Sequence, residues 1–307
     1  MQEFPSKLNV LNINKFNKLK FAMYHRNSIK ELLDWGTIQL TNNKVESPRL
    51  NAELILCHIL QLKKIGLYSK FDRILTGKEA QNFYELTERR CSGEPLQYIL
   101  GKVNFLGYDF KIKPGVLIPR PETELLCKIA IDSIENDIAK ILDIGTGSGC
   151  IALTIAKERP SVTVRAIDNS DSALEIAKSN AAFHGLSNVN FENCDILNNL
   201  PAESGFDIII SNPPYINLND YTLLDKVVKD WEPRSALTDE FDGLTFYKRY
   251  ADIFPELLKP TGTFFLEIGF GMAHDIEKIF SSKGFICVFF KDFSSIPRIV
   301  QGSLKQL

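Results

Sequence analysis

The sequence lacks long apolar runs, closely spaced cysteines and a large net charge, and each absence removes a class of function. Its longest apolar runs have the length of a strand, whereas a helix that spans a membrane needs ~18–20 apolar residues. The first residues also lack the apolar segment of a secretory signal. We therefore expect a cytoplasmic protein with no membrane partner.

The six cysteines and four histidines are too scattered to form a recognisable ligand set, and no CxxC pair occurs. A zinc site or a disulfide framework would require closer, patterned spacing. The sequence therefore predicts no metal and a reducing compartment.

The net charge is −2, so the chain has no global electrostatic signature of nucleic-acid binding. Residues 1–30 do carry six basic residues against one acidic residue. Because residues 1–26 show no sustained periodicity, we expect a flexible, solvated tail there. Stable nucleic-acid binding is not expected.

Residues 27–92 are predicted to form a small all-helical domain. Three patterns typical of helix starts stand ahead of apolar residues at helical intervals. They are Ser28 with Glu31, Ser47 with Pro48, and Thr76 with Glu79. In residues 93–120, glycines and prolines separate short β-like runs, which predicts a β-hairpin linker to a second domain.

Residues 121–307 alternate between strand-length apolar runs and helical segments. Near-continuous apolar strands separated by helices predict an α/β fold whose parallel sheet is covered on both faces. The predicted strands are 139–144, 162–168, 188–192, 206–211, 262–268 and 284–290. One predicted helix begins at Pro121, and the others lie near 149–158, 170–183, 246–258 and 272–282.

The first of these strands runs into a glycine-rich loop, Gly145–Gly149, and then into a helix. Glycines allow a tight turn and close approach to a ligand, and a helix N-terminus offers free N–H groups. Asp168 ends the second strand, where a carboxylate can accept hydrogen bonds from both ribose hydroxyls. The loop alone would indicate only a tight turn, but together with Asp168 it predicts a nucleotide site. As a ligand residue, Asp168 should be replaceable with little change in folding.

The spacing of the loop bears on which nucleotide binds. A dinucleotide fingerprint places a glycine or alanine at its last position, which Cys150 occupies here, because the third glycine comes one position early. Cysteine is small, so this departure does not exclude a dinucleotide. With Asp143 two residues before the first glycine, the spacing D-x-G-x-G-x-G resembles that of S-adenosyl-L-methionine (SAM) methyltransferases.

The strand 206–211 ends in Asn212-Pro213-Pro214-Tyr215. Ligands of open α/β sheets bind beyond the carboxyl ends of the strands, so this tetrapeptide should lie beside the glycine loop. Its prolines stiffen the turn and remove N–H donors, which leaves an asparagine oxygen, backbone carbonyls and an aromatic face. Two such acceptors can hold both N–H bonds of a conjugated –NH2 group, direct its lone pair at an electrophile and stabilise the developing positive charge.

With these motifs in place, roughly residues 28–302 resemble the release factor glutamine N5-methyltransferases (HemK/PrmC-like proteins). The shared landmarks, in the family's order, are Glu94–Gly101, Leu117–Glu124, Asp143–Gly149, Asn212–Tyr215, Glu232-Pro233 with Ala236-Leu237, Asp242–Leu244 and Leu266–Gly269. In that family, a helical N-terminal domain and a hairpin precede a SAM-binding catalytic domain with a Rossmann-like sheet.

The resemblance implies SAM-dependent methylation of the side-chain amide (N5) of the glutamine in the Gly-Gly-Gln motif of class-I peptide-chain release factors. Asn212 and Pro213 would then be catalytic and, with Pro214 and Tyr215, would bind the glutamine. The implied cofactor residues are Gly145, Thr146, Gly147, Ser148, Gly149, Asp168, Asp195, Ile196 and Asn212. The roles of Arg120, Glu122, Glu232 and Glu267 stay open, as does the oligomeric state.

Three other functions compete with this interpretation. An N6-adenine methyltransferase could use the same Asn-Pro-Pro-Tyr edge, although it would need a basic surface for base flipping. A nucleotide-dependent oxidoreductase on a Rossmann sheet is disfavoured by the early third glycine, and a non-catalytic SAM-binding module by the intact acceptor residues.

Overall fold

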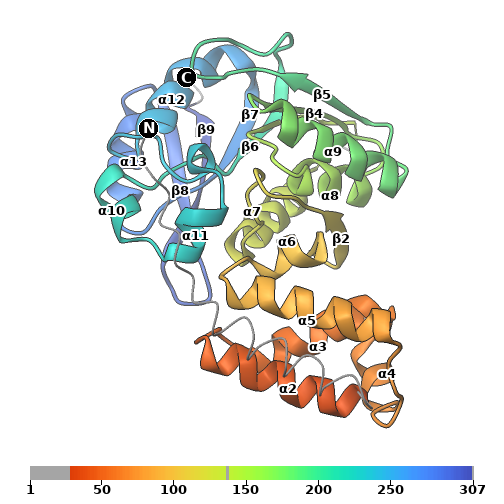
Figure 1. Cartoon of the computed structure of the whole chain (residues 1–307). Helices are drawn as coiled ribbons and strands as arrows, with labels where there is room; N and C mark the ends of the chain where they lie inside the picture. Colours follow the sequence, from red (N-terminus) through yellow and green to blue (C-terminus); the bar gives the residue numbers. More distant parts are fainter. Residues whose placement is uncertain (1–27, 136–137, 306–307) are drawn as a thin grey trace, which may run out of the picture. The chain divides into compact units, whose positions relative to one another are not determined.

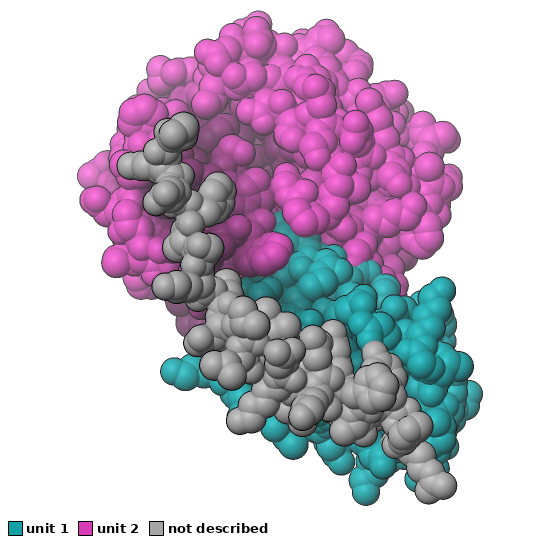
Figure 2. Space-filling view, viewed as in Figure 1, with its two compact units in different colours: residues 1–100 teal, residues 101–307 magenta. Residues whose placement is uncertain are grey.

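A computed structural model describes residues 28–135 and 138–305, so the predicted tail, residues 1–26, lies outside the described residues (Figure 1). The chain divides into two compact units between Leu100 and Gly101 (Figure 2). The sequence places the end of the helical domain at residue 92. The structural division comes later because residues 96–100 form a short helix that packs within the first unit. In the described part of the chain, no helix combines the length and apolarity that crossing a membrane requires.

The first unit is built from helices. Both predicted capping boxes form, with Ser28 and Glu31 at the start of α2 and with Thr76 and Glu79 at the start of α5. Ser47 precedes α3, but its side chain makes no capping bond, because its backbone is left-handed (φ 49°) rather than extended. The helices are α2 (Ile29–Asn42), α3 (Pro48–Leu60), α4 (Lys64–Tyr68), α5 (Gly77–Cys91) and α6 (Leu96–Leu100).

The second unit begins with the predicted hairpin, formed by antiparallel strands β1 (Lys102–Phe105) and β2 (Tyr108–Lys111). Phe105 and Phe110 are buried in the core that helices of this unit share with its sheet. The side chain of Asn180 on α9 (Asp171–His184) accepts a hydrogen bond from the Lys111 N–H at 2.8 Å and donates one to the Lys111 carbonyl at 3.0 Å. These contacts make the hairpin part of the second unit.

Seven strands form the central sheet, in the order β5-β4-β3-β6-β7-β9-β8. The strands from β5 to β7 pair in parallel, whereas β9 is antiparallel to both of its neighbours. The sheet is parallel as predicted from β5 to β7, and one antiparallel strand that was not predicted, β9, lies between β7 and the edge strand β8. The bounds are β3 (Lys140–Ile144), β4 (Thr163–Asp168), β5 (Val189–Asn193), β6 (Phe206–Ser211), β7 (Leu258–Glu267), β8 (Phe285–Lys291) and β9 (Pro297–Leu304).

The strand β9 was not predicted because it contains Pro297 and Gly302, two residue types that usually interrupt strands. Gly302 has a packing reason to be there. The ring of Phe264 on β7 lies 2.2 Å from the position that a Cβ at residue 302 would take. A glycine at this position therefore leaves the space that the Phe264 ring occupies against the neighbouring strand.

Helices cover both faces of the sheet (Figure 1). Residues of α7 (Pro121–Asp132), α8 (Cys150–Glu158) and α9 form one core with the sheet, and residues of α12 (Thr245–Leu257) and α13 (Ala273–Ser281) form the other. Successive residues of β3, such as Ile141 and Leu142, enter opposite cores. This double burial explains the near-continuous apolar runs. Between β6 and α12 lie α10 (Leu218–Leu223), α11 (Lys226–Trp231) and the 3-10 turn η1 (Arg234–Ala236).

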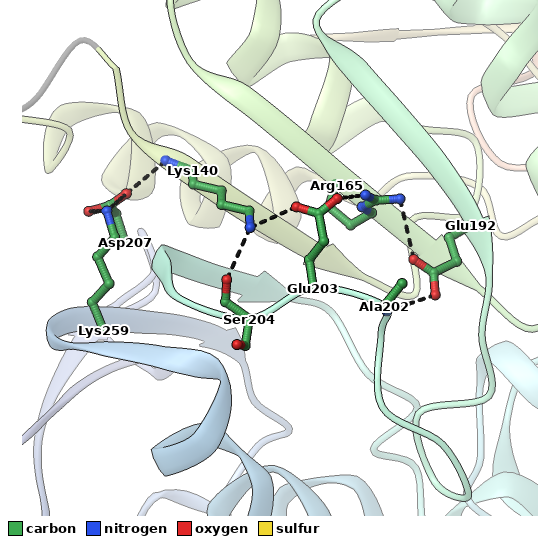
Figure 3. A network of polar contacts seen from close by, with 8 residues as sticks. All are labelled: Lys140, Arg165, Glu192, Ala202, Glu203, Ser204, Asp207 and Lys259. Atoms are coloured by element: carbon green, nitrogen blue, oxygen red, sulfur yellow. Dashed lines mark hydrogen bonds and ion pairs between the residues drawn. The ribbon is translucent and has the colours of Figure 1, made fainter.

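A polar network ties the strands together where β3, β6 and β7 begin (Figure 3). Asp207 accepts hydrogen bonds from the Lys140 N–H at 2.8 Å and from the Lys259 ammonium at 2.7 Å. The Lys140 ammonium pairs with Glu203 at 2.7 Å, and Glu203 also pairs with Arg165 of β4. The network thereby fixes the loop that leads into β6.

Candidate functional site

A cleft lies beyond the carboxyl ends of β3, β4 and β6, as expected for a ligand site on an open α/β sheet. Most of the predicted site residues line this cleft. They are Gly145, Thr146, Gly147, Ser148, Asp168, Asp195, Ile196, Asn212, Pro213 and Pro214. Of the predicted residues, Gly149 and Tyr215 do not form part of its lining.

The glycine loop that precedes α8 uses most of its own N–H groups in hydrogen bonds inside the protein. The N–H groups of Gly145 and Thr146 both donate to the Ile167 carbonyl, at 2.9 and 3.0 Å. The Gly149 N–H donates to the Thr146 carbonyl at 2.8 Å. The Gly147 N–H donates to Asp168 Oδ2 at 2.9 Å. What the loop offers a ligand is bare backbone: a Cβ on Gly145 would meet no atom within 4 Å.

The third glycine of the loop has a packing role. Gly149 has a positive φ of 80°, and a Cβ on it would lie 3.0 Å from Leu153 and 3.1 Å from Ala177. These two neighbours belong to α8 and α9. A side chain at residue 149 would therefore strain the backbone and separate the two helices from the loop.

The carboxylates of Asp168 and Asp195 line the cleft, whereas Asp143 lies buried beside the glycine loop, outside that lining. Asp168 is half-buried and accepts from the N–H groups of Gly147 and Ser170, each at 2.9 Å. Asp143 is fully buried, and its Oδ2 accepts from the Thr146 hydroxyl at 2.7 Å. Among the described residues its Oδ1 has no hydrogen-bond partner. Burial, assisted by the nearby charge of Asp168, raises the pKa of Asp143 to about 7.

These features fit SAM. Its sulfonium and amino groups favour an acidic surrounding, and its ribose diol matches a carboxylate that already has fixed hydrogen bonds. The uncovered backbone of Gly145 leaves room for close approach, and Ile196 supplies an apolar surface beside Asp195. The residues present therefore suit the cofactor that the sequence predicts.

The end of β6 is held firmly beneath the Asn-Pro-Pro segment. The hydroxyl of Ser211 donates to the Ile144 carbonyl at 2.8 Å and lies 3.0 Å from the Tyr250 hydroxyl. Asn212 follows directly and donates through Nδ2 to the hydroxyl of Thr123 on α7, at 3.0 Å. The segment is thus fixed to β3, α12 and α7 at once.

Tyr215 lies against the interior of the unit. Its ring approaches Gly269 so closely that a Cβ there would lie 3.1 Å from the ring. Its hydroxyl donates to Glu267 Oε1 at 3.1 Å, and burial raises its pKa well above the usual range. In this arrangement Tyr215 supports the segment rather than lining the cleft.

A loop after η1 encloses the residues that follow the two prolines. Gly243 has a positive φ of 80°, and a Cβ on it would lie 2.4 Å from the carbonyl oxygen of Tyr215. Ile216 forms a parallel bridge with Thr238, and the carboxylate of Asp239 accepts from three backbone N–H groups of the loop. The landmark Asp242–Leu244 is therefore a close backbone contact with the candidate substrate edge.

Two further segments form walls of the cleft. Glu232 is buried and joins them, because it pairs with Arg120 at 2.5 Å and accepts from the Ile118 N–H at 3.2 Å. The ion pair gives a structural contact to Arg120 and Glu232, whose roles the sequence left open. The wall residues are Val116, Leu117 and Pro119 on one segment, and Pro233, Ser235 and Ala236 on the other.

Sequence reasoning also missed several lining residues. Asn169 and Ser170 directly follow Asp168, so the position after a strand end could have identified them. Phe246 and Tyr250 lie on α12, where an apolar helix stripe gives no signal of a cleft. Thr123 also lines the cleft, and it donates a hydrogen bond of 2.7 Å to Glu267, whose role the sequence left open; 144 positions separate the two residues, and no spacing rule relates them.

Two family models match the sequence, the PrmC N-terminal domain over residues 31–101 and a methyltransferase domain over residues 135–281. The release factor glutamine methyltransferase of Geobacter sulfurreducens is 40% identical over 278 residues, which cover 90% of this chain and 97% of that protein. The protein of the same name in Koribacter versatilis is 40% identical over 277 residues, covering 90% and 98%. That of Aliivibrio fischeri is 36% identical over 276 residues, covering 90% and 97%.

Proposed function

The chain belongs to the release factor glutamine methyltransferase family and is a SAM-dependent methyltransferase, and from this premise we propose its substrate. The substrate is the glutamine of the Gly-Gly-Gln motif in a class-I peptide-chain release factor, methylated on the side-chain amide nitrogen (N5). The observation that carries the proposal is the rigid Asn212–Pro214 edge, which lines the same cleft as Asp168, Asp195 and the glycine loop.

The cleft residues would hold the cofactor. Asp168 would accept from the ribose hydroxyls, Asp195 and Ile196 would line the adenine, and the loop Gly145–Gly149 would receive the methionine part. In support, all of these residues except Gly149 line the cleft. SAM supplies a methyl group that its sulfonium charge already activates. The chain's own contribution is to orient this group toward the edge at Asn212.

The substrate edge would overcome the poor nucleophilicity of an amide. The nitrogen lone pair of a glutamine amide is delocalised into its carbonyl. Asn212 Oδ1 and the Pro213 carbonyl can together accept both N–H bonds, turn the nitrogen toward tetrahedral geometry and stabilise the positive charge that develops on it. Alignment of the two reactants in one cleft can add roughly 7–11 kcal/mol.

The experiment that tests the proposal is incubation of the full chain with methyl-labelled SAM and, separately, with intact release factor, duplex DNA and RNA. We expect label on release factor, mapped by mass spectrometry to the Gly-Gly-Gln glutamine. Label on adenine with none on release factor would instead identify a nucleic-acid methyltransferase.

We propose that the helical first unit contributes to recognition. A glutamine side chain is small, so a pocket around Asn212 can distinguish an amide but cannot select one glutamine among a proteome's thousands. A chain that begins at Gly101 should therefore methylate intact release factor much more slowly than the full chain. A short Gly-Gly-Gln peptide should be a poor substrate for both. Equal rates on the intact factor would exclude this role.

We also propose that the reaction takes place in the cytoplasm. All six cysteines are free in the described structure, in keeping with a reducing compartment.

A further inference from the structure

A chain of buried hydrogen bonds runs from the substrate edge into the core. Asn212 Nδ2 lies 3.0 Å from Thr123 Oγ1, and Thr123 Oγ1 lies 2.7 Å from Glu267 Oε2. Tyr215 donates to the other oxygen, Oε1, at 3.1 Å. Thr123 and Glu267 are 3% and 1% exposed, so water cannot substitute for any partner in the middle of this chain.

While Glu267 is ionised, counting protons fixes the direction of these bonds. An ionised carboxylate can only accept, so Thr123 must donate its single hydroxyl proton to Glu267. Its oxygen is then left only as an acceptor toward Asn212. The group that faces Thr123 must therefore be the –NH2 of Asn212, which turns Oδ1 away from Thr123.

We propose that Thr123 and Glu267 are positioning residues, which hold the Asn212 amide in the one orientation that presents Oδ1 to the substrate nitrogen. The proposal rests on the proposed function in one respect, that the methyl acceptor is an –NH2 group. An –NH2 substrate needs acceptors, and the opposite orientation of Asn212 would confront it with another –NH2 donor. Thr123 belongs to the landmark Leu117–Glu124 and Glu267 to the landmark Leu266–Gly269, so both landmarks would help to orient the Asn212 amide toward the reacting nitrogen.

The ionisation of Glu267 controls this direction. A protonated Glu267 could donate to Thr123, Thr123 could then donate to Asn212, and the amide would turn its oxygen inward. Burial raises the pKa of Glu267 to about 7, while the hydrogen bonds from Thr123 and Tyr215 oppose the shift. The charged and titratable groups facing it are Glu122 on α7, Tyr215 after β6, Tyr247 on α12, whose hydroxyl donates to the Glu267 carbonyl, and Arg298 on β9.

Glu122 raises and Arg298 lowers the pKa of Glu267, so their effects oppose each other. We therefore expect kcat of the wild-type chain to fall as the pH drops below about 7, because protonation of Glu267 releases the fixed direction of the Asn212 amide. The affinity for SAM should change much less over the same range.

The test compares three substitutions in the full chain. Thr123→Val keeps the shape but removes the acceptor, and should lower kcat roughly 5- to 100-fold with little change in the KM for SAM. Thr123→Ser keeps the hydroxyl and should restore most of the rate. Thr154→Val on α8 is the matched control, because Thr154 is equally buried and its hydroxyl has no partner among the described residues. It should leave kcat unchanged.

The pH profile separates positioning from mere packing. Thr123→Val should lose the decline of kcat below pH 7, because it breaks the link between Glu267 and Asn212. A Thr123→Val chain with wild-type kcat and a wild-type pH profile would overturn the proposal.

A second readout is independent of the substrate. In protein labelled with 15N-asparagine, the side-chain –NH2 signal of Asn212 can be identified by its absence from Asn212→Asp. We expect this signal to shift as the pH falls through 7, and to move in Thr123→Val but not in Thr154→Val. A signal that Thr123→Val leaves in place would overturn the inference. If the wild-type chain labels no release factor, the proposed function fails, and this NMR comparison still decides the positioning role.

Discussion

Replacing Asp168 with alanine should weaken SAM binding and also loosen the glycine loop, because one carboxylate serves both. Its Oδ2 accepts from the Gly147 N–H and its Oδ1 from the Ser170 N–H, each at 2.9 Å. Alanine leaves both donors without their acceptor. The structure therefore argues against the expectation from sequence that folding would hardly change.

The size of the effect follows from how far water can compensate. A hydrogen bond to a charged group contributes ~1.5–3 kcal/mol, and the half-buried position of Asp168 at an open cleft lets water replace part of it. We expect the ligand-free chain to lose about 1–3 kcal/mol of stability. For a unit of this size that corresponds to roughly 2–10 °C in melting temperature. Loss of the acceptor for the ribose diol should raise the Kd for SAM about 10- to 100-fold.

Calorimetric titration with SAM and thermal unfolding without ligand measure the two effects separately. The control is Asp171→Asn, which removes a neighbouring charge on α9 but keeps an oxygen for the hydrogen bond from Asn193. It should leave both measurements nearly unchanged. An unaltered SAM affinity in Asp168→Ala would remove this residue from the cofactor site, and an unaltered melting temperature would refute its support of the loop.

Three further predictions concern the substrate edge and the buried carboxyl group of Asp143. Asn212→Ala should lower the methylation rate at least ~10²–10³-fold while calorimetry finds SAM affinity largely intact; near-normal turnover would exclude the amide from the reaction. Gly243→Ala should lower the free energy of unfolding in urea by at least about 2 kcal/mol more than Gly205→Ala does. Both glycines have a positive φ, but only at residue 243 would a Cβ lie 2.4 Å from a carbonyl oxygen, so equal losses would contradict the contact with Tyr215. Burial raises the pKa of Asp143 from its usual 3.8 to about 7, so the stability of the ligand-free chain falls as the pH rises from about 4 to 7. Asp143→Asn should therefore raise the free energy of unfolding in urea by about 1–3 kcal/mol at pH 8 but not at pH 4, and an effect independent of pH would refute the burial argument.

The sequence predicted those parts of the fold that depend on local signals. Capping boxes at Ser28 and Thr76 mark real helix starts, and the apolar runs of β3, β4 and β6 appear at their expected positions. β9 was not predicted, because what stabilises Pro297–Leu304 as a strand is pairing with β7 and β8 and the room that Gly302 gives to Phe264. Those interactions are not encoded in any local pattern.

The same distinction applies to the site. Motif residues such as Gly145 and Asp168 stand beside strand ends, so their meeting at one cleft follows from topology alone. The contact between Thr123 and Glu267 depends on how α7 packs on β7, which periodicity cannot specify. The motif also predicts a ligand contact for Tyr215, which stays a prediction, and no local pattern indicated that its hydroxyl donates to Glu267.

The charged network around Lys140, Glu203 and Asp207 lies where the strands begin, whereas the cleft lies where the same strands end. The residues that tie the strands together therefore lie at the opposite end of the sheet from the residues that line the cleft. Substitutions in the charged network should therefore change the stability of the chain with little effect on the rate of methyl transfer.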